Sequence, residues 1–260
     1  MILLVSDLHL GKKPETDQVS LAELRTCIES FAPEVKHVVF LGDTFDAFVE
    51  YPGRIPRSVG LWTQLAHDLQ ESGMEVSYFQ GNHDRWHDSY IEHALGIPVH
   101  KKSVLLSYQG LRLWLEHGDM SFPHRRSIRL GRVLTDHRLS FLIYRFVLPF
   151  GLGHRLAAWV SRTYSNSEPD PETAELMRHY ALSLLKSDKA DMVAMGHCHT
   201  ASLARSSFGI YANTGDWYTG RTFVTLSDRV SLFKWRGKSS ELVLEVDFSS
   251  NDNISGASDV

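Results

Sequence analysis

Apolar positions in the first part of the chain follow two alternating patterns. Short apolar runs, each followed by glycine or acidic residues, predict strands at 1–6, 36–41 and 74–80. The segments between them, 19–31 and 58–72, place apolar residues at helical spacing. Alternating strands and helices predict βαβ units with a buried parallel sheet, and ligands bind such sheets beyond the carboxyl ends of the strands.

The sequence pattern of the second half of the chain predicts both helix and strand, with strands more numerous. Two runs around Gln109-Gly110 predict a hairpin, and Asp170-Pro171 marks the start of a helix that runs to about 186. Alternating runs then predict strands at 191–195, 202–206, 210–212, 221–226, 230–235 and 241–247. We interpret residues 1–248 as a single two-sheet α/β domain. Residues 249–260 are polar and aperiodic, which predicts a disordered tail.

An insertion is expected at about 121–168. Its portion Ser121–Tyr164 holds eight arginines and one acidic residue, which gives a net charge of +7. Because the whole chain has a net charge of −4, the rest of the chain has a net charge of −11. The stretch 139–152 is strongly apolar but is interrupted by Arg145 and Pro149. It is too short to span a bilayer, and it fits helices with an apolar face and a basic rim. The alternative is a helical hairpin that only caps the core, with its arginines in solvent.

Composition narrows the class of protein. At 260 residues and 43% hydrophobic, the chain can bury a full core. Two distant cysteines predict no disulfide framework, and the lack of a leader or a long apolar run predicts a soluble cytoplasmic protein. The negative charge outside the insertion argues against a nucleic-acid partner. No obligate protein partner is evident.

Five short motifs follow predicted strands and carry the candidate chemistry. They are Asp7-Leu8-His9, Gly42-Asp43-Thr44-Phe45-Asp46, Gly81-Asn82-His83-Asp84, His117-Gly118-Asp119 and Gly196-His197-Cys198-His199. We expect them at the mouth of one sheet. Carboxylate, amide and imidazole groups together suit a pair of divalent metals, Mn, Fe or Zn rather than Ca, and such a pair implies phosphate-ester chemistry. Alone, Asp-x-His or Gly-Asp would read as a turn, Asn-His-Asp as a loop cap and His-x-His as surface or core histidines. The other nine histidines are assigned ordinary structural roles.

These motifs resemble the calcineurin-like metallophosphoesterase family, whose pattern is D-x-H, G-D-x-x-D, G-N-H-D/E, H and G-H-x-H. The resemblance implies a four-layer α/β/β/α metallophosphoesterase sandwich with a helical lid insertion. It also implies two metal ions, one held by Asp7, His9, Asp43 and His199, and the other by Asp43, Asn82, His117 and His197. By the same resemblance His83, held by Asp84, stabilises the phosphoryl oxygens or protonates the leaving group, which makes His83, Asp84 and Asp43 the catalytic candidates. Asp46 is expected to orient a ligand.

Within this family the chain looks most like the UDP-2,3-diacylglucosamine diphosphatases of lipid A synthesis. The resemblance lies in Ser6–His9, Glu116–Asp119, Asn213–Trp217 and the insertion ending at 162–167. It implies hydrolysis of a nucleotide-linked glycolipid to UMP and 2,3-diacylglucosamine 1-phosphate, with manganese as the favoured metal. It also implies peripheral binding to the cytoplasmic face of the inner membrane. Candidate substrate contacts are Arg85, Arg125, Arg129, Arg162, Ser165 and Asn166.

One motif departs from that subgroup. The subgroup reads G-N-R-D-F where this chain has Gly81-Asn82-His83-Asp84-Arg85. The alternative is therefore a phosphodiesterase or phosphatase of another substrate, such as nucleotides or phosphoproteins. A third hypothesis is a scaffold without catalysis that uses the basic insertion to dock on membranes.

Overall fold

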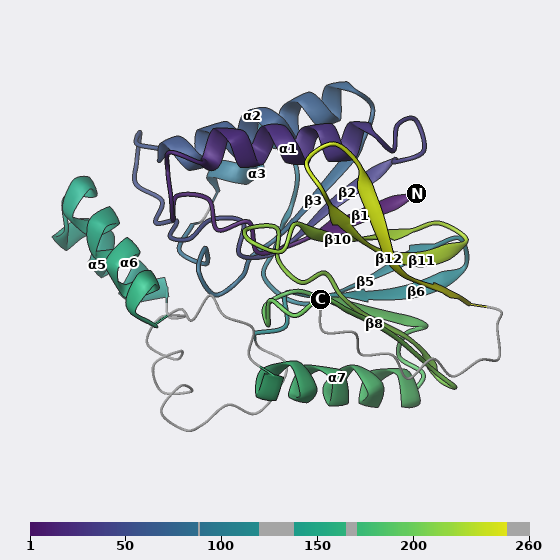
Figure 1. Cartoon of the computed structure of the whole chain (residues 1–260). Coiled ribbons are helices and arrows are strands. Elements are labelled where there is room, and N and C mark those ends of the chain that lie inside the picture. Colours follow the sequence, from purple (N-terminus) through teal and green to yellow (C-terminus); the bar gives the residue numbers. More distant parts are fainter. Residues whose placement is uncertain (88, 120–137, 165–170, 249–260) are drawn as a thin grey trace.

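Two β-sheets packed face to face form the centre of the molecule, and helices cover the outer face of each (Figure 1). The structure, a computed structural model, describes residues 1–87, 89–119, 138–164 and 171–248. Helices α1, α2 and α3 cover the larger sheet, and α7 covers the smaller one. The prediction of a four-layer α/β/β/α sandwich is confirmed.

The larger sheet contains seven strands in the order β12-β11-β10-β1-β2-β3-β4. Strands β1 to β4 run parallel, and β10 pairs antiparallel with β1 on the other side. In sheet order the strands span Ser240–Asp247, Arg229–Trp235, Thr222–Leu226, Ile2–Val5, His37–Leu41, Glu75–Phe79 and Val99–His100. The parallel centre therefore brings the ends of β1, β2 and β3 to the same edge.

The smaller sheet contains five strands in the order β5-β6-β7-β9-β8. The predicted hairpin is its β5–β6 pair, while β6, β7 and β9 run parallel. In sheet order the strands span Val104–Tyr108, Leu111–Leu115, Met192–Met195, Gly209–Asn213 and Ser202–Ser206.

The helices match the predicted spans except at short or interrupted segments. They are α1 Asp17–Glu29, α2 Arg57–Glu71, α3 Tyr90–Leu95, α5 Arg138–Val147, α6 Phe150–Tyr164 and α7 Pro171–Lys186. Pro149 separates α5 from α6, because proline disfavours helical geometry at the residue before it. Among the described residues, no helix combines the length and apolar character that crossing a bilayer requires.

The central strands have both faces buried. In β1, Leu3 and Val5 join the core under α1 and α2, whereas Ile2 and Leu4 join the core between the two sheets. Because side chains alternate along a strand, four consecutive apolar residues serve two separate cores. This explains the continuous apolar runs that precede the first two motifs, at Ile2–Val5 and 38–41.

A buried histidine makes the stability of this core depend on pH. His87 stacks on Phe48 with ring centroids 4.9 Å apart, and burial lowers its pKa to about 3 from an ordinary 6.5. Protonation therefore favours the unfolded chain, so this contribution to stability is complete above pH 6.5 and is lost as the pH falls toward 3. Between pH 7 and pH 5 the metal-free protein should lose about 2 kcal/mol from this group.

Urea unfolding of His87→Phe at the two pH values measures this loss. The loss of stability between the two pH values should be smaller in the variant than in the wild type by roughly 2 kcal/mol. His179→Phe on the exposed side of α7 serves as the matched control and should retain it. Equal pH dependence in His87→Phe and the wild type would contradict the assignment.

Candidate metal centre

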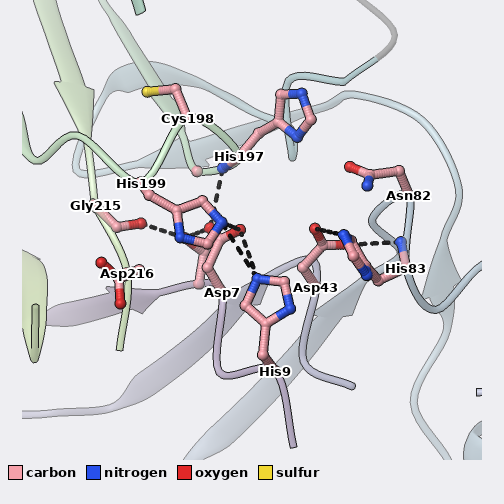
Figure 2. A network of polar contacts seen from close by, with 12 residues as sticks. Asp7, His9, Asp43, Asn82, His83, His197, Cys198, His199, Gly215 and Asp216 are labelled. Carbon is pink, nitrogen blue, oxygen red and sulfur yellow. Dashed lines mark hydrogen bonds and ion pairs between the residues drawn. The ribbon is translucent and has the colours of Figure 1, made fainter. Parts of the chain in front are cut away.

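The five motifs meet at one place between the two sheets. The first three follow β1, β2 and β3 of the larger sheet, and the last two follow β6 and β7 of the smaller one. The expectation of a single sheet is therefore wrong, since the two sheets pack so that the carboxyl ends of their parallel strands face one centre. Figure 2 shows the side chains of Asp7, His9, Asp43, His197 and His199 gathered there.

Five of the candidate ligands have a left-handed backbone. Asp7, His9, Asp43, His197 and His199 have φ between 46° and 71°. Residues other than glycine adopt this conformation at a cost of about 1–2 kcal/mol each, although aspartate and histidine tolerate it better than most. Strain concentrated in this way is typical of functional sites, where it turns consecutive side chains toward one point.

Asp7, His9 and His199 form the first candidate ligand group. The Nε2 atoms of His9 and His199 lie 3.2 Å apart, and they lie 3.8 and 3.4 Å from Asp7 Oδ1. Asp7 Oδ1 is buried and has no hydrogen-bond donor among the described residues. A buried carboxylate oxygen facing two imidazole nitrogens is an arrangement that a divalent cation would satisfy.

The second group consists of Asp43, His117 and His197, with Asn82 beside it. His117 Nε2 lies 3.2 Å from Asp43 Oδ2 and 3.3 Å from the Asn82 side-chain oxygen. On the other side of the ring, His117 Nδ1 donates to the Leu41 carbonyl at 2.8 Å. That bond leaves Nε2 as the metal-facing nitrogen. All seven residues predicted as ligands are thus brought into two adjacent clusters whose donor sets fit divalent cations.

In the absence of metal, protonated His117 offsets only part of the carboxylate charge of the two groups. Burial is the main cause that raises the pKa of Asp7 to about 6, and the charge of Asp43 adds to it. Burial acts on Asp43 in the same direction, but the surrounding imidazoles, His117 first among them, together outweigh it and hold the pKa of Asp43 well below its usual range. Despite burial, Asp43 holds the pKa of His117 well above its usual range. A bound cation would replace that proton, so we expect binding to release protons.

The first motif is anchored by residues to which the sequence prediction assigned no role. Ser6 Oγ and the His197 amide both donate to Asp7 Oδ2, the latter at 3.0 Å. Ser6 also contacts Thr214 Oγ1 at 2.7 Å. Asp46 Oδ1 lies 3.6 Å from Nδ1 of a second candidate ligand, His9, which is beyond hydrogen-bond distance, so the orienting role of Asp46 stays a prediction. No single-sequence signal marks Ser6 or Thr214 as supports.

Three glycines allow the motifs to approach one another closely. A Cβ at Gly42 would lie 2.5 Å from His117 Nδ1, and one at Gly81 would lie 2.5 Å from the Asp43 amide nitrogen. A Cβ at Gly196 would lie 2.7 Å from Asp7 Oδ2. Each glycine therefore makes room for the candidate ligand of another motif, which explains its place beside a ligand of its own.

The third motif differs from the expectation in one contact. Asp84 does not hold His83: its oxygens accept from the Gly81 amide at 2.7 Å, the Tyr78 hydroxyl at 2.9 Å and the Phe45 amide at 3.3 Å. Asp84 is fully buried, and the hydrogen bonds that its carboxylate accepts hold the loop of the third motif rather than the His83 imidazole. The His83 ring faces the Asp46 carbonyl instead, at 3.0 Å from Nδ1.

Of the six predicted substrate contacts, only Arg85 has a side chain within the described part of the structure. Arg85 donates to Asp119 at 2.5 Å, an ion pair that ties the third motif to the fourth. Arg162 belongs to α6, but its side chain lies outside the described parts. Arg125, Arg129, Ser165 and Asn166, with the tail 249–260, also lie outside the described residues. Contact of these residues with substrate remains a prediction.

Helices α5 and α6 pack beside the third motif through aromatic side chains. Trp86, which follows Arg85, lies 4.8 Å from the ring of Tyr144, and Tyr51 lies 5.5 Å from that of Phe150. The other face of these helices is exposed: Phe146 is 80% exposed, Val147 69% and Trp159 59%. Helices α5 and α6 therefore present an apolar surface next to the candidate metal centre, as the sequence pattern of apolar helices with basic edges predicts.

The clustered side chains are candidate sites for divalent cations, and pairs of such cations are the cofactors of metal-dependent phosphoester hydrolases. The calcineurin-like phosphoesterase family model matches residues 1–201, and the chain belongs to this family. A UDP-2,3-diacylglucosamine hydrolase of Porphyromonas gingivalis is 28% identical over 76% of this chain and 82% of its own length. A hydrolase with the same name from Pseudomonas savastanoi pv. phaseolicola is 26% identical over 84% and 88%.

The fold is also similar to that of a solved structure. Vacuolar protein sorting 29 from Cryptosporidium parvum superposes with a TM-score of 0.50 at 13% identity, over 95% of this chain and 97% of the other. At this identity the likeness concerns the fold alone.

Proposed function

We propose that this protein hydrolyses the pyrophosphate of UDP-2,3-diacylglucosamine, with release of UMP and 2,3-diacylglucosamine 1-phosphate. The main observation that supports this proposal is that a group of side chains suited to divalent cations lies beside helices α5 and α6, whose exposed face is apolar. Water adds across the P–O–P bridge, so that each product carries one phosphate. The names of the curated relatives support this substrate class.

The residues of the centre take distinct roles in this proposal. Asp7, His9 and His199 would hold one cation, His117, His197 and Asn82 the other, and Asp43 would contact both. Two such ions, manganese in the first instance with iron or zinc as alternatives, would activate water and neutralise phosphoryl charge. His83 lies with Nε2 3.9 Å from Asp43 Oδ2, so it can stabilise the reacting phosphoryl oxygens or protonate the leaving group.

The insertion supplies the proposed lipid contact. Exposed apolar side chains on α5 and α6 would cover acyl chains or enter the edge of a bilayer, while their basic residues meet phosphate. We infer peripheral association with the cytoplasmic face of the inner membrane.

A substrate panel with manganese and detergent tests the proposal. The glycolipid should turn over about a hundredfold faster or more than UDP-N-acetylglucosamine, which has the same pyrophosphate without acyl chains. Products are separated by ion-exchange chromatography, with bis(4-nitrophenyl) phosphate as a soluble diester. Faster cleavage of the soluble diester than of the glycolipid would overturn the lipid assignment and favour a general phosphodiesterase.

A further inference from the structure

The imidazole of His83 is held from two sides. Its Nδ1 lies 3.0 Å from the backbone carbonyl of Asp46 and 2.9 Å from the hydroxyl oxygen of Ser161. A carbonyl can only accept a hydrogen bond, so Nδ1 must carry a proton to satisfy that contact. The Ser161 oxygen then accepts the second branch of a bifurcated hydrogen bond from the same N–H group. The opposite nitrogen, Nε2, is left facing Asp43 and the centre.

These two partners come from different parts of the chain. Asp46 belongs to the second motif and is buried at the centre. Ser161 lies on α6, 78 residues away from His83 in sequence, within the arginine-rich insertion. One of the two contacts that orient the ring therefore depends on where α6 lies.

The position of α6 is set by close packing on the body of the protein. Gly153 lies against Tyr51, such that a Cβ there would collide with the Tyr51 hydroxyl and lie 3.2 Å from the Tyr144 ring. The Tyr144 hydroxyl donates to the Gly153 carbonyl at 2.5 Å, which joins α5 to α6. Gly151 lies two residues earlier on the same helix, and a Cβ there meets nothing within 4 Å.

We propose that Ser161 is a positioning residue for His83, through which the docked insertion completes the catalytic centre. This inference rests on the proposed phosphoester hydrolysis. With Ser161 in place, the ring is held by two acceptors and presents Nε2 to the reacting phosphoryl group. Without it, the ring keeps only the Asp46 carbonyl as an anchor and can rotate. The insertion then has a second role besides covering the lipid.

Steady-state kinetics of Ser161→Ala test the proposal. We expect kcat to fall about tenfold, the effect of one lost hydrogen bond, with KM changed less than twofold and metal content unchanged. Ser161→Thr keeps the hydroxyl and should restore at least half of kcat. Thr163→Ala is the control, because Thr163 is exposed on the same helix and, among the described residues, its hydroxyl donates only to the Trp159 carbonyl of α6. It should behave as wild type.

A double-mutant cycle separates positioning from a general effect on α6. In a His83→Ala background, Ser161→Ala should have no further effect on kcat, because its effect passes through the imidazole. Gly153→Ala should undock α6 and lower kcat as Ser161→Ala does, whereas Gly151→Ala should not. A full tenfold loss on adding Ser161→Ala to His83→Ala, or a normal kcat in Ser161→Ala, would overturn the proposal.

The tautomer of His83 gives a readout that needs no turnover. Imidazole 15N shifts of the zinc-loaded wild type should show a protonated Nδ1, and in Ser161→Ala the His83 signals should shift and broaden because the ring, held by one anchor, samples more than one orientation. Unchanged shifts in the variant would count against Ser161 whatever the substrate proves to be. If the glycolipid is not cleaved, the kinetic tests are run on bis(4-nitrophenyl) phosphate, so failure of the substrate assignment and failure of the Ser161 proposal remain distinguishable.

Discussion

Replacing Asp43 with asparagine is expected to lower turnover by about three orders of magnitude and to reduce bound metal from two ions per chain to one or fewer. Asp43 is fully buried and its Oδ2 lies 3.2 Å from His117 Nε2, while Oδ1 accepts from the His83 amide at 2.9 Å. The amide has nearly the same shape, so the loop should stay in place while the charge that draws the cations is lost. Metal content is measured by mass spectrometry on the purified variant.

The matched control is Asp191→Asn. Asp191 precedes β7 at the end opposite the centre, and it pairs with Arg112 at 2.9 Å on the surface. Loss of this partly exposed pair should cost at most about 1 kcal/mol of stability and leave metal and turnover unchanged. Two ions and full turnover in Asp43→Asn would show that Asp43 is not a ligand.

Gly81→Ala should be nearly as damaging, although it removes no functional group. Its Cβ would collide with Asp43 Oδ1 and lie 2.5 Å from the Asp43 amide nitrogen, so the backbone itself would have to move. We expect turnover to fall about a hundredfold or more, with partial loss of metal and a loss of stability of about 1–3 kcal/mol.

Gly60→Ala provides the comparison for this substitution. Gly60 lies within α2, and a Cβ there meets nothing within 4 Å. Alanine should stabilise this helix by about 0.5–1 kcal/mol and leave turnover intact. Thermal unfolding and kinetics of both variants check the contrast. Wild-type activity in Gly81→Ala would mean that Asp43 is not held as described.

The strands and most helices could be predicted because their causes are local. The continuous apolar run of β1 and the capping sequence at Pro171 both act within a few residues. Helix α3 and strand β4 were not predicted, since six- and two-residue elements carry too little periodic signal. The break between α5 and α6 could be located from Pro149.

The candidate ligands could be named from sequence, but their relations could not. Left-handed backbone at Asp7 and the close approach of Gly81 to Asp43 arise from packing between motifs far apart in the chain. The assignment of Asp84 to His83 was wrong because neighbours in sequence point to different partners on a tight turn. Ser161 offered no signal, since one serine on an apolar helix resembles any other.

The most direct test measures UMP release as manganese is added to the metal-free protein with UDP-2,3-diacylglucosamine in detergent. The two-ion account predicts no release without metal, a maximum rate at two bound ions per chain, and equal amounts of UMP and 2,3-diacylglucosamine 1-phosphate. Full release from the metal-free protein, or no release at two bound ions, would contradict it.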